Sequence, residues 1–160
     1  MILDTQTVFS GAVSAAGVRS GQSLTATAIS TNVLDLRNAS TPALADESLV
    51  GGDMWLVVTA LTAAAGADSA KTLTITLLSD STTNLATSPT THYTSAAITG
   101  AAITAGAELV RIKVPSGDYE RYLGLNYTAS ATFTAFEIAA FLTPDVQRNK
   151  IYPSGFTVDA

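Results

Sequence analysis

The feature that most constrains the fold is an alternation of apolar and polar residues with a period of two. In the segment KTLTITLLS, residues 71–79, Leu73, Ile75 and Leu77 alternate with threonines. Because successive side chains of a β-strand point to opposite faces, the segment predicts a strand with one buried face. The same alternation recurs in ELVRIKV, RYLGLNYT and TFTAFEIAAFLT, which are residues 108–114, 121–128 and 132–143.

Four further segments complete the set of predicted strands. The run MWLVVTAL, residues 54–61, is almost continuously apolar and rich in β-branched residues, which is typical of a central strand. Weaker strands are expected in SLTATAI, TNVLDL and THYTSAA, which start at Ser23, Thr31 and Thr91. The segments between the strands are rich in Gly, Ser, Asn and Pro, the residues that favour turns.

About eight short strands with no amphipathic helix predict an all-β fold, an antiparallel β-sandwich. Eight strands in two sheets is the jelly-roll number, so we expect a jelly-roll-like sandwich, although the pattern leaves other sandwich topologies open. Residues 95–107 are ambiguous. Their alanines favour a short helix, whereas Gly100, Gly106 and the threonines favour a strand followed by a loop.

The chain of 160 residues is predicted to form one domain with two extended ends. We assign residues 23–142 to the sandwich, 1–22 to an N-terminal arm and 143–160 to a C-terminal arm. The prolines and glycine of the C-terminal arm argue against a long helix or an interior strand. Both arms are also too apolar for a solvated disordered tail. They are expected to pack either on their own sandwich or on a neighbouring subunit.

Charge and composition exclude several classes of partner. The net charge is −5, and the eight Lys and Arg residues are scattered along the chain. Nucleic acids and anionic membranes are held by clustered basic residues, so neither is expected as a partner. The N-terminus lacks the basic and apolar regions of a signal peptide, and no apolar run approaches the length of a membrane span. There is no Cys, so a disulfide framework and a Cys-based zinc site are excluded.

The sequence shows no pattern typical of an active site. His92 is the only histidine, and no nucleophile elbow, glycine-rich dinucleotide motif or phosphate-binding loop is present. The carboxylates closest in sequence, Asp46, Glu47 and Asp53 in one group and Asp118 and Glu120 in another, do not match a calcium loop. We therefore expect a protein that is not an enzyme and that binds no metal or cofactor.

Four segments carry a resemblance to a known family. They are MILDTQTVFSGAVS at the start, STNVLDL from Ser30, ERYLGLNYT from Glu120 and FLTPDVQRNKIYPSGFTV from Phe141. Together they resemble the capsid cement, or decoration, proteins of tailed bacteriophages, of the kind found in a short-tailed Bordetella phage. The resemblance runs from Met1 to Val158 and is carried mainly by the ends. It implies a jelly-roll-like sandwich on the outside of an icosahedral head.

The resemblance also implies partners and a location. The partners are the major capsid protein and further copies of this chain, with a dimer favoured over a trimer. The location is the exterior of the virion, after synthesis in the cytoplasm of the bacterial host. Another β-sandwich virion component, such as a head fibre or receptor-binding domain, is the alternative. Because a few buried apolar anchors usually carry most binding energy, the contact residues are expected at the ends and beside Glu120. They are Ile2, Leu3, Val8, Phe9, Arg121, Tyr122, Ile151, Tyr152, Pro153 and Phe156.

Overall fold

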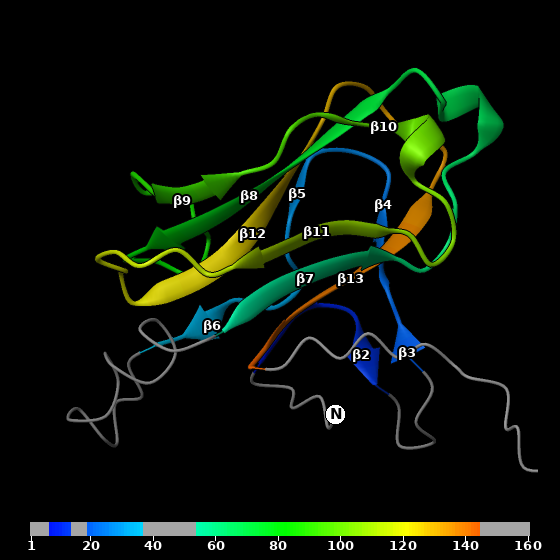
Figure 1. Ribbon diagram of the computed structural model, residues 1–160. Coiled ribbons are helices and arrows are strands. Elements are labelled where there is room, and N and C mark those ends of the chain that lie inside the picture. The colour runs from blue at the N-terminus through cyan, green and yellow to red at the C-terminus, as the bar shows by residue number, and fades with distance from the viewer. Residues whose placement is uncertain (1–6, 14–18, 37–53, 145–160) are drawn as a thin grey trace, which may run out of the picture.

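Two antiparallel sheets packed against each other form the body of the protein (Figure 1). The computed structural model describes residues 7–13, 19–36 and 54–144. Within these residues the only helical elements with described bounds are two single turns of 3-10 helix, η2 (Gly66–Asp68) and η3 (Gly100–Ala102). The predicted all-β antiparallel sandwich is therefore confirmed.

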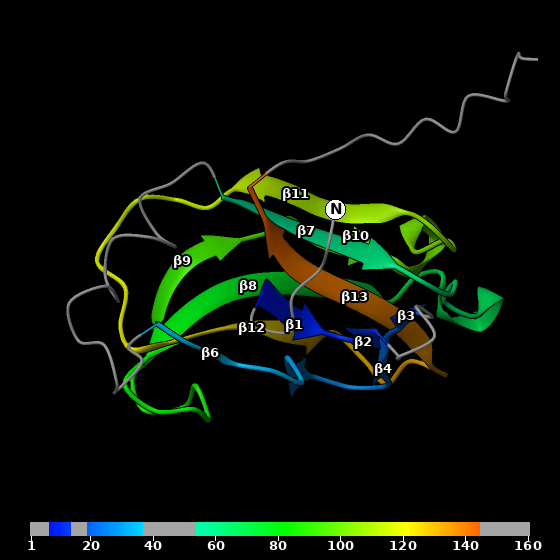
Figure 2. The ribbon, with the colours of Figure 1, turned by 90° about the horizontal axis from the view of Figure 1, so that it is seen from below.

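The first sheet contains five strands. Its main path runs β1 (Val8–Ser10), β13 (Phe136–Thr143), β7 (Trp55–Ala60) and β11 (Glu108–Lys113), and β4 (Gln22–Leu24) also pairs with β13. The central position of β7, between β13 and β11, matches its nearly continuous apolar sequence. Figure 2 shows β11, β7, β13 and β1 side by side.

The second sheet contains six strands, and its longest pair is at the centre. Its main path runs β10 (Ile98–Thr99), β8 (Thr72–Asp80), β12 (Tyr122–Ala129) and β5 (Ala28–Ile29). Two more strands lie at its edges. Strand β9 (Thr90–Thr94) pairs with β8, and β6 (Leu34–Asp35) pairs with β12. A separate hairpin joins β2 (Ala12–Val13) to β3 (Arg19–Ser20).

The strand order is that of a jelly roll. Three edge positions are each shared by two short strands, β1 with β4, β5 with β6, and β9 with β10. Numbered along the described part of the chain, the positions then read 1-8-3-6 in the first sheet and 2-7-4-5 in the second. Four positions in each sheet make the eight of a jelly roll, as the sequence pattern predicts.

The core lies between the two sheets and is made by the predicted alternation. Leu73, Ile75 and Leu77 of β8 are buried, as are Leu123, Leu125 and Tyr127 of β12. The facing strand β13 contributes Phe136, Ile138, Ala140 and Leu142. In β11, Val110 is buried and Ile112 packs against the core.

The ambiguous segment 95–107 forms a short strand followed by a loop. Ile98 and Thr99 form β10, which pairs with the start of β8, and η3 follows as one helical turn. Gly100 is buried there, and a Cβ at this position would lie only 2.1 Å from the carbonyl oxygen of Asp68. The glycine therefore allows two loops to meet at this end of the sandwich.

The sandwich begins earlier than residue 23. Strand β1 pairs with β13, so residues 8–10 belong to the first sheet rather than to an arm. Phe9 is fully buried in the core, with 0% of its surface exposed. Gly11 follows with φ of +97°, and a Cβ there would lie 2.4 Å from the carbonyl oxygen of Ser20. The boundary expected after residue 22 therefore moves, because the alternation in VFS is too short to be recognised as a strand.

A buried polar network joins β1 to the second sheet. The hydroxyl of Ser10 donates to Oε1 of Gln22 at 2.6 Å and lies 2.6 Å from the hydroxyl of Tyr127. Since the proton of Ser10 goes to Gln22, Tyr127 donates to Ser10. Burial raises the pKa of Tyr127, which keeps this hydroxyl protonated as a donor. The backbone N–H of Thr31 also donates to Gln22 Oε1 at 2.9 Å, so the network anchors the loop after β5.

This network predicts an asymmetry between two conservative substitutions. Ser10→Ala leaves the Tyr127 hydroxyl buried without a partner, which should cost about 1–3 kcal/mol of stability. Tyr127→Phe leaves Ser10 still bonded to Gln22, and its cost should be nearer 0.5–1.5 kcal/mol. Urea denaturation of both variants and of the double variant measures the difference. The assigned hydrogen-bond direction would be contradicted if the two single variants lost equal free energy of unfolding. It would also be contradicted if the loss in the double variant equalled the sum of the two single losses.

Candidate functional site

The described residues hold no arrangement suited to a metal ion. No group of three or more His, Cys, Asp or Glu side chains is close enough to ligate one within residues 7–13, 19–36 and 54–144. In the same residues, no helix has the length and apolar character needed to cross a bilayer. The single histidine, the polar networks and the surfaces are the remaining candidate features of the described residues.

His92 forms a pair with a serine that the sequence pattern did not reveal. The Oγ of Ser79 on β8 lies 2.7 Å from Nε2 of His92 on β9. The same Oγ accepts the backbone N–H of Glu120 at 3.1 Å, and the ring of Tyr119 stacks on the imidazole with centroids 3.8 Å apart. The pair therefore joins the edge strand β9 to the loop that precedes β12.

The Ser79–His92 pair is built for structure rather than for nucleophilic attack. Ser79 is 0% exposed, so no substrate could approach its oxygen. Burial lowers the pKa of His92, while the charge of Glu120 opposes this shift. The neutral ring that burial favours can accept the proton of Ser79. Burial also raises the pKa of Tyr119 to about 12, and its hydroxyl donates to the carbonyl of Pro115.

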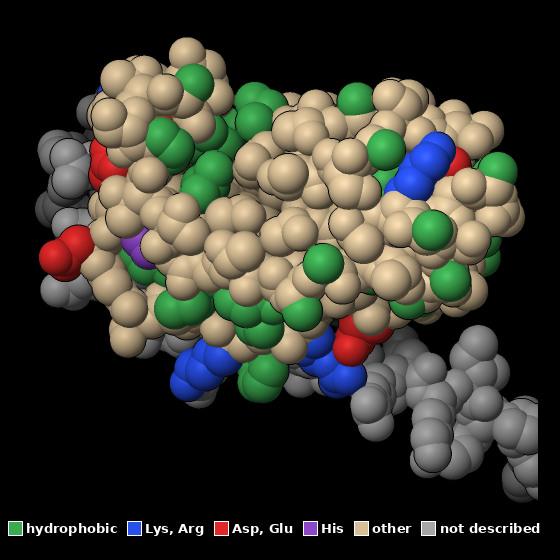
Figure 3. All heavy atoms as spheres, turned by 90° about the horizontal axis from the view of Figure 1, so that it is seen from above, with side chains coloured by type: hydrophobic (Ala, Val, Ile, Leu, Met, Phe, Trp, Pro, Cys, Tyr) green, Lys and Arg blue, Asp and Glu red, His purple; other side chains and the backbone are tan. Residues whose placement is uncertain are grey.

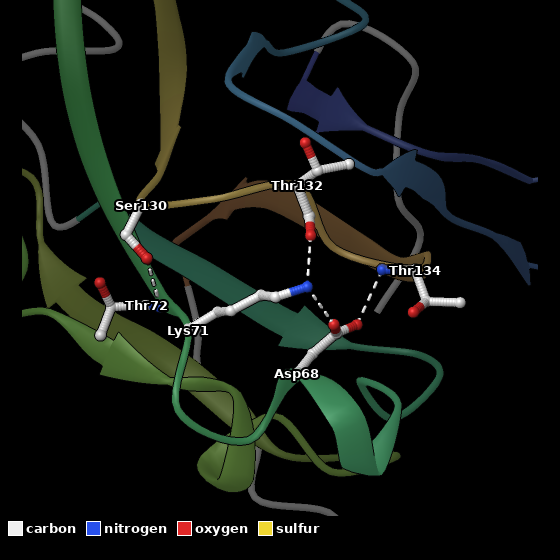
Figure 4. A network of polar contacts seen from close by, with 6 residues as sticks. All are labelled: Asp68, Lys71, Thr72, Ser130, Thr132 and Thr134. Carbon is white, nitrogen blue, oxygen red and sulfur yellow. Dashed lines mark hydrogen bonds and ion pairs between the residues drawn. The ribbon is translucent and has the colours of Figure 1, made fainter.

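A second network ties the loops at the opposite end of β8. Asp68 is buried, and its Oδ1 lies 2.5 Å from Nζ of Lys71 (Figure 4). Its Oδ2 accepts the backbone N–H of Thr134 at 2.7 Å, and Lys71 also donates to the carbonyl of Thr132. The hydrogen bond from Lys71 is the largest cause of the lowered pKa of Asp68. Through the bonds to Thr132 and Thr134, this ion pair fixes η2 to the segment that leads into β13.

Arg121 lies at an end of the second sheet in a preset orientation. Its Nε donates to Oδ1 of Asp35 at 3.0 Å, and its NH2 donates to Oδ2 at 2.8 Å. The guanidinium carbon also stands 4.9 Å from the ring centroid of Tyr122. Such a two-pronged contact holds the guanidinium in one plane while 42% of the side chain stays exposed. The pairing depends on the register of β6 against β12, which the sequence did not predict.

The other predicted contact residues divide into two groups. Val8 and Phe9 are buried in strand β1, at 8% and 0% exposure, so neither presents a free side chain to a partner. Ile2, Leu3, Ile151, Tyr152, Pro153 and Phe156 lie outside the described residues. Among the four predicted residues that the structure describes, Arg121 contacts Tyr122, whereas Val8 and Phe9 lie on opposite faces of β1.

The outer face of the second sheet is polar and uncharged at its centre. Thr72, Thr74 and Thr76 of β8 point away from the core and alternate with its buried residues. Their cross-strand neighbours are also polar, namely Thr94, Thr99, Asn126 and Thr128. Figure 3 looks onto the molecule from above, and its charged side chains lie towards the margins of the view. Ile29 of β5 is a large apolar side chain that keeps 39% of its surface exposed.

The outer face of the first sheet combines charged and apolar residues, since Arg111 of β11 pairs with Val57 of β7. Val8, Val57 and Phe141 form a second apolar cluster that is separate from the core. They point away from it, because Leu56, Val58, Ala140 and Leu142, next to them in sequence, point inward. We refer to these three residues as the outer cluster. Each is at most 8% exposed.

Residues 18–142 match the family model Bbp16. The chain belongs to the Bbp16 family. No curated protein matches the chain. Bbp16 is the name of a Bordetella phage protein, and membership is consistent with the predicted resemblance to a phage virion protein. The match ends at residue 142, within β13.

The His92 environment predicts a pH dependence of stability. The pKa of His92 is lowered in the folded chain, so the unfolded chain binds more protons in the range below its ordinary pKa near 6.5. The stability contributed by the neutral ring is therefore present above pH 6.5 and is lost as the pH falls below it. We expect the urea concentration at the midpoint of unfolding to decrease as the pH is lowered from 7.5 to 5.5.

The matched variant for this measurement is His92→Gln, which keeps a polar side chain without an imidazole titration. Its urea midpoint should change less over the same interval than that of the unmodified chain. An equal decrease in both proteins would show that another group causes the effect.

Proposed function

We propose that this chain is a capsid cement, or decoration, protein. It binds the outer surface of an icosahedral phage head and stabilises the contacts between major capsid protein subunits. It also associates with itself, as a dimer rather than a trimer, and it acts on the virion exterior after synthesis in the bacterial cytoplasm. It carries out no reaction and needs no cofactor.

The observation that carries this proposal is membership of the Bbp16 family, whose matched region spans most of the jelly roll. A phage protein of this kind needs a body that keeps its shape under load. The two polar networks support this role, because Asp68 with Lys71 ties loops at one end of β8 and Ser79 with His92 ties them at the other. Loops fixed by side-chain hydrogen bonds lose little further entropy when the body docks.

The charge distribution supports a protein partner over nucleic acid. The chain has a net charge of −5, whereas binding to phosphates needs clustered positive side chains. Arg111 and Arg121 are already paired with carboxylates, Glu108 and Asp35 respectively. A position on the exterior of the head suits this charge better than a position against packaged DNA, and no membrane contact is proposed.

The contacts are proposed at two places. The first is the Arg121–Tyr122 pair, where the guanidinium is oriented and partly exposed. The second is the C-terminal segment, whose Ile151, Tyr152 and Phe156 are the kind of anchors that dominate interfaces. Pro153 restricts the segment before docking and so reduces the entropy lost on binding. Because each head carries many copies, modest single contacts add up to strong retention.

A decoration assay tests the proposal directly. Heads built from the major capsid protein that accompanies this chain, and lacking the chain itself, are mixed with the purified protein and sedimented. The unmodified chain should cosediment and should raise the temperature at which the heads release DNA. A Tyr152→Ala, Phe156→Ala double variant should bind at least about tenfold more weakly, since two anchors are removed.

The matched control is Thr74→Ala with Thr128→Ala, which alters the outer face of the second sheet and should bind normally. Heads that are equally stable with and without the chain would contradict the proposed cement function. Full binding by the Tyr152→Ala, Phe156→Ala variant would show that these side chains are not the anchors, and it would not contradict the cement function.

A further inference from the structure

A long uncharged stretch of the chain lies at one edge of the second sheet. Residues 81–107 contain no Asp, Glu, Lys or Arg. The stretch includes β9 and β10, which together fill this edge position beside β8. Thr90, Thr91 and Thr94 of β9 are exposed. Because charged side chains are a common protection of edge strands, an exposed edge without them is open to pairing with another strand.

The other edges of the sandwich are protected by charge or by shortness. Strand β11 forms one edge of the first sheet and carries Arg111 and Lys113 on its outer face. The two remaining edges are filled by β1 with β4 and by β5 with β6, strands of only three and two residues. Among the edges that the structure describes, β9 is therefore the one that combines five residues with an absence of charge.

The backbone of β9 directs hydrogen-bonding groups at this edge. On its other side β9 pairs with β8, and the N–H of Ser95 directly after it donates to the carbonyl of Ile75 at 2.9 Å. Backbone groups of an antiparallel strand alternate between its two sides, so the N–H and C=O of Thr94 point away from β8. In the described part of the chain, no strand pairs with this side of β9. A further strand can therefore be added here.

Apolar side chains beside this edge are incompletely buried. Tyr93 of β9 and Ile98 of β10 pack against the core but are only partly buried. Leu109 and Ile112 of β11 are in the same state, and Figure 2 shows β9 and β11 towards the same side of the sandwich. A partner docked at this side would remove more of these side chains from water, which favours association.

We propose that the free edge of β9 is the surface by which two copies of this chain associate, in antiparallel pairing about a two-fold axis at Tyr93. The inference rests on the self-association in the proposed function and names its surface. A two-fold axis brings an edge against itself, so an edge with charges of one sign would repel its own copy. Strand β9 has no such charge, whereas β11 would bring Arg111 and Lys113 towards the same residues of the second copy.

The register of the pair follows from the faces of β9. Thr91 and Thr94 both lie on the outer face, because they pair with Leu78 and Thr76, which alternate with inward residues of β8. An irregularity in the register between them accounts for two residues three positions apart sharing a face. Tyr93 packs inward against the core. An axis at Tyr93 therefore sets Thr91 of one copy opposite Thr94 of the other and brings the two Tyr93 rings together.

The contact is small, so the association should depend on concentration. Stable interfaces usually bury about 1,200–2,000 Å². A strand of five residues with one aromatic ring at its centre buries less than this. We therefore expect a monomer–dimer equilibrium in dilute solution. Copies held side by side on a head would pair more completely, because their effective concentration is higher.

Charge substitutions test the surface and the register together. Thr91→Lys with Thr94→Lys places like charges opposite each other and should weaken association at least about tenfold. Thr91→Lys with Thr94→Glu places each Lys opposite a Glu of the second copy and should preserve association. Sedimentation equilibrium measures the mass, which lies between 16.4 kDa for the monomer and twice this value for the dimer. The matched control, Thr25→Lys with Thr128→Lys, changes two exposed residues outside β9 and should associate like the unmodified chain.

Disulfide trapping reads the contact directly, because the chain contains no Cys. An equal mixture of full-length Thr91→Cys and Thr94→Cys chains is oxidised and analysed by non-reducing electrophoresis. The mixture should form a covalent dimer at least about tenfold faster than either variant alone, since only the mixed pair places the two thiols opposite each other. A mixture of Thr91→Cys with Thr128→Cys is the control and should cross-link slowly. Circular dichroism checks that every variant keeps its strands.

The outcomes separate this surface from the cement function. Equal association of the Lys–Lys and Lys–Glu variants would overturn the proposal, as would a Cys mixture that cross-links no faster than its control. A monomeric unmodified chain whose binding to heads is lost in the Lys–Lys variant would also overturn it, because the edge would then belong to the capsid protein. Cosedimentation of the unmodified chain with heads is scored separately. A chain that dimerises through β9 but does not bind heads would contradict the cement function alone.

Discussion

The structure depends on the burial of two apolar sheet faces against each other. The inner residues of β8 and β12 meet those of β13 and β7, and their side chains are almost completely removed from water. Each buried side chain of this size contributes roughly 1.5–3 kcal/mol relative to exposure, so this layer supplies the main driving force for folding. Every other feature, including the short edge strands and the long loops, is positioned by these central strands.

Polar groups that this layer buries are satisfied in pairs that also join separate elements. Tyr127 points into the core and finds Ser10 on the opposite sheet, which links β12 to β1. Ser79 is buried at the end of β8 and bonds both to His92 and to the backbone of Glu120. Because an unsatisfied buried polar group is costly, these bonds restrict each loop to one arrangement. The burial of polar groups in the core therefore also holds the loops in place, because the bonds that satisfy these groups reach into the loops.

The sequence predicted the features that depend on local alternation and missed those that depend on register. The strands of residues 71–79, 121–128 and 132–143 each carry a clear period of two, and their inner faces are buried as expected. Strand β1 has three residues, which are too few for a period, so Phe9 was assigned to an arm. The Arg121–Asp35 pair and the Ser79–His92 pair join residues 86 and 13 positions apart, and only the pairing of β6 and β9 with their neighbours reveals them.

The described body of this jelly roll combines a fixed shape with a surface that has few apolar groups. Its interior fixes the distances between loops, while the outer face of the second sheet offers threonines that are uncharged and bind water readily. Strong attachment to a partner needs apolar or aromatic anchors, and among the described residues the exposed surface offers few of them. Two further aromatic side chains, Tyr152 and Phe156, lie beyond β13 in the sequence that follows Pro144. Under the proposed cement function, strong attachment is confined to this segment and to the Arg121–Tyr122 pair, while the threonine-covered face lets the protein stay dissolved at high concentration.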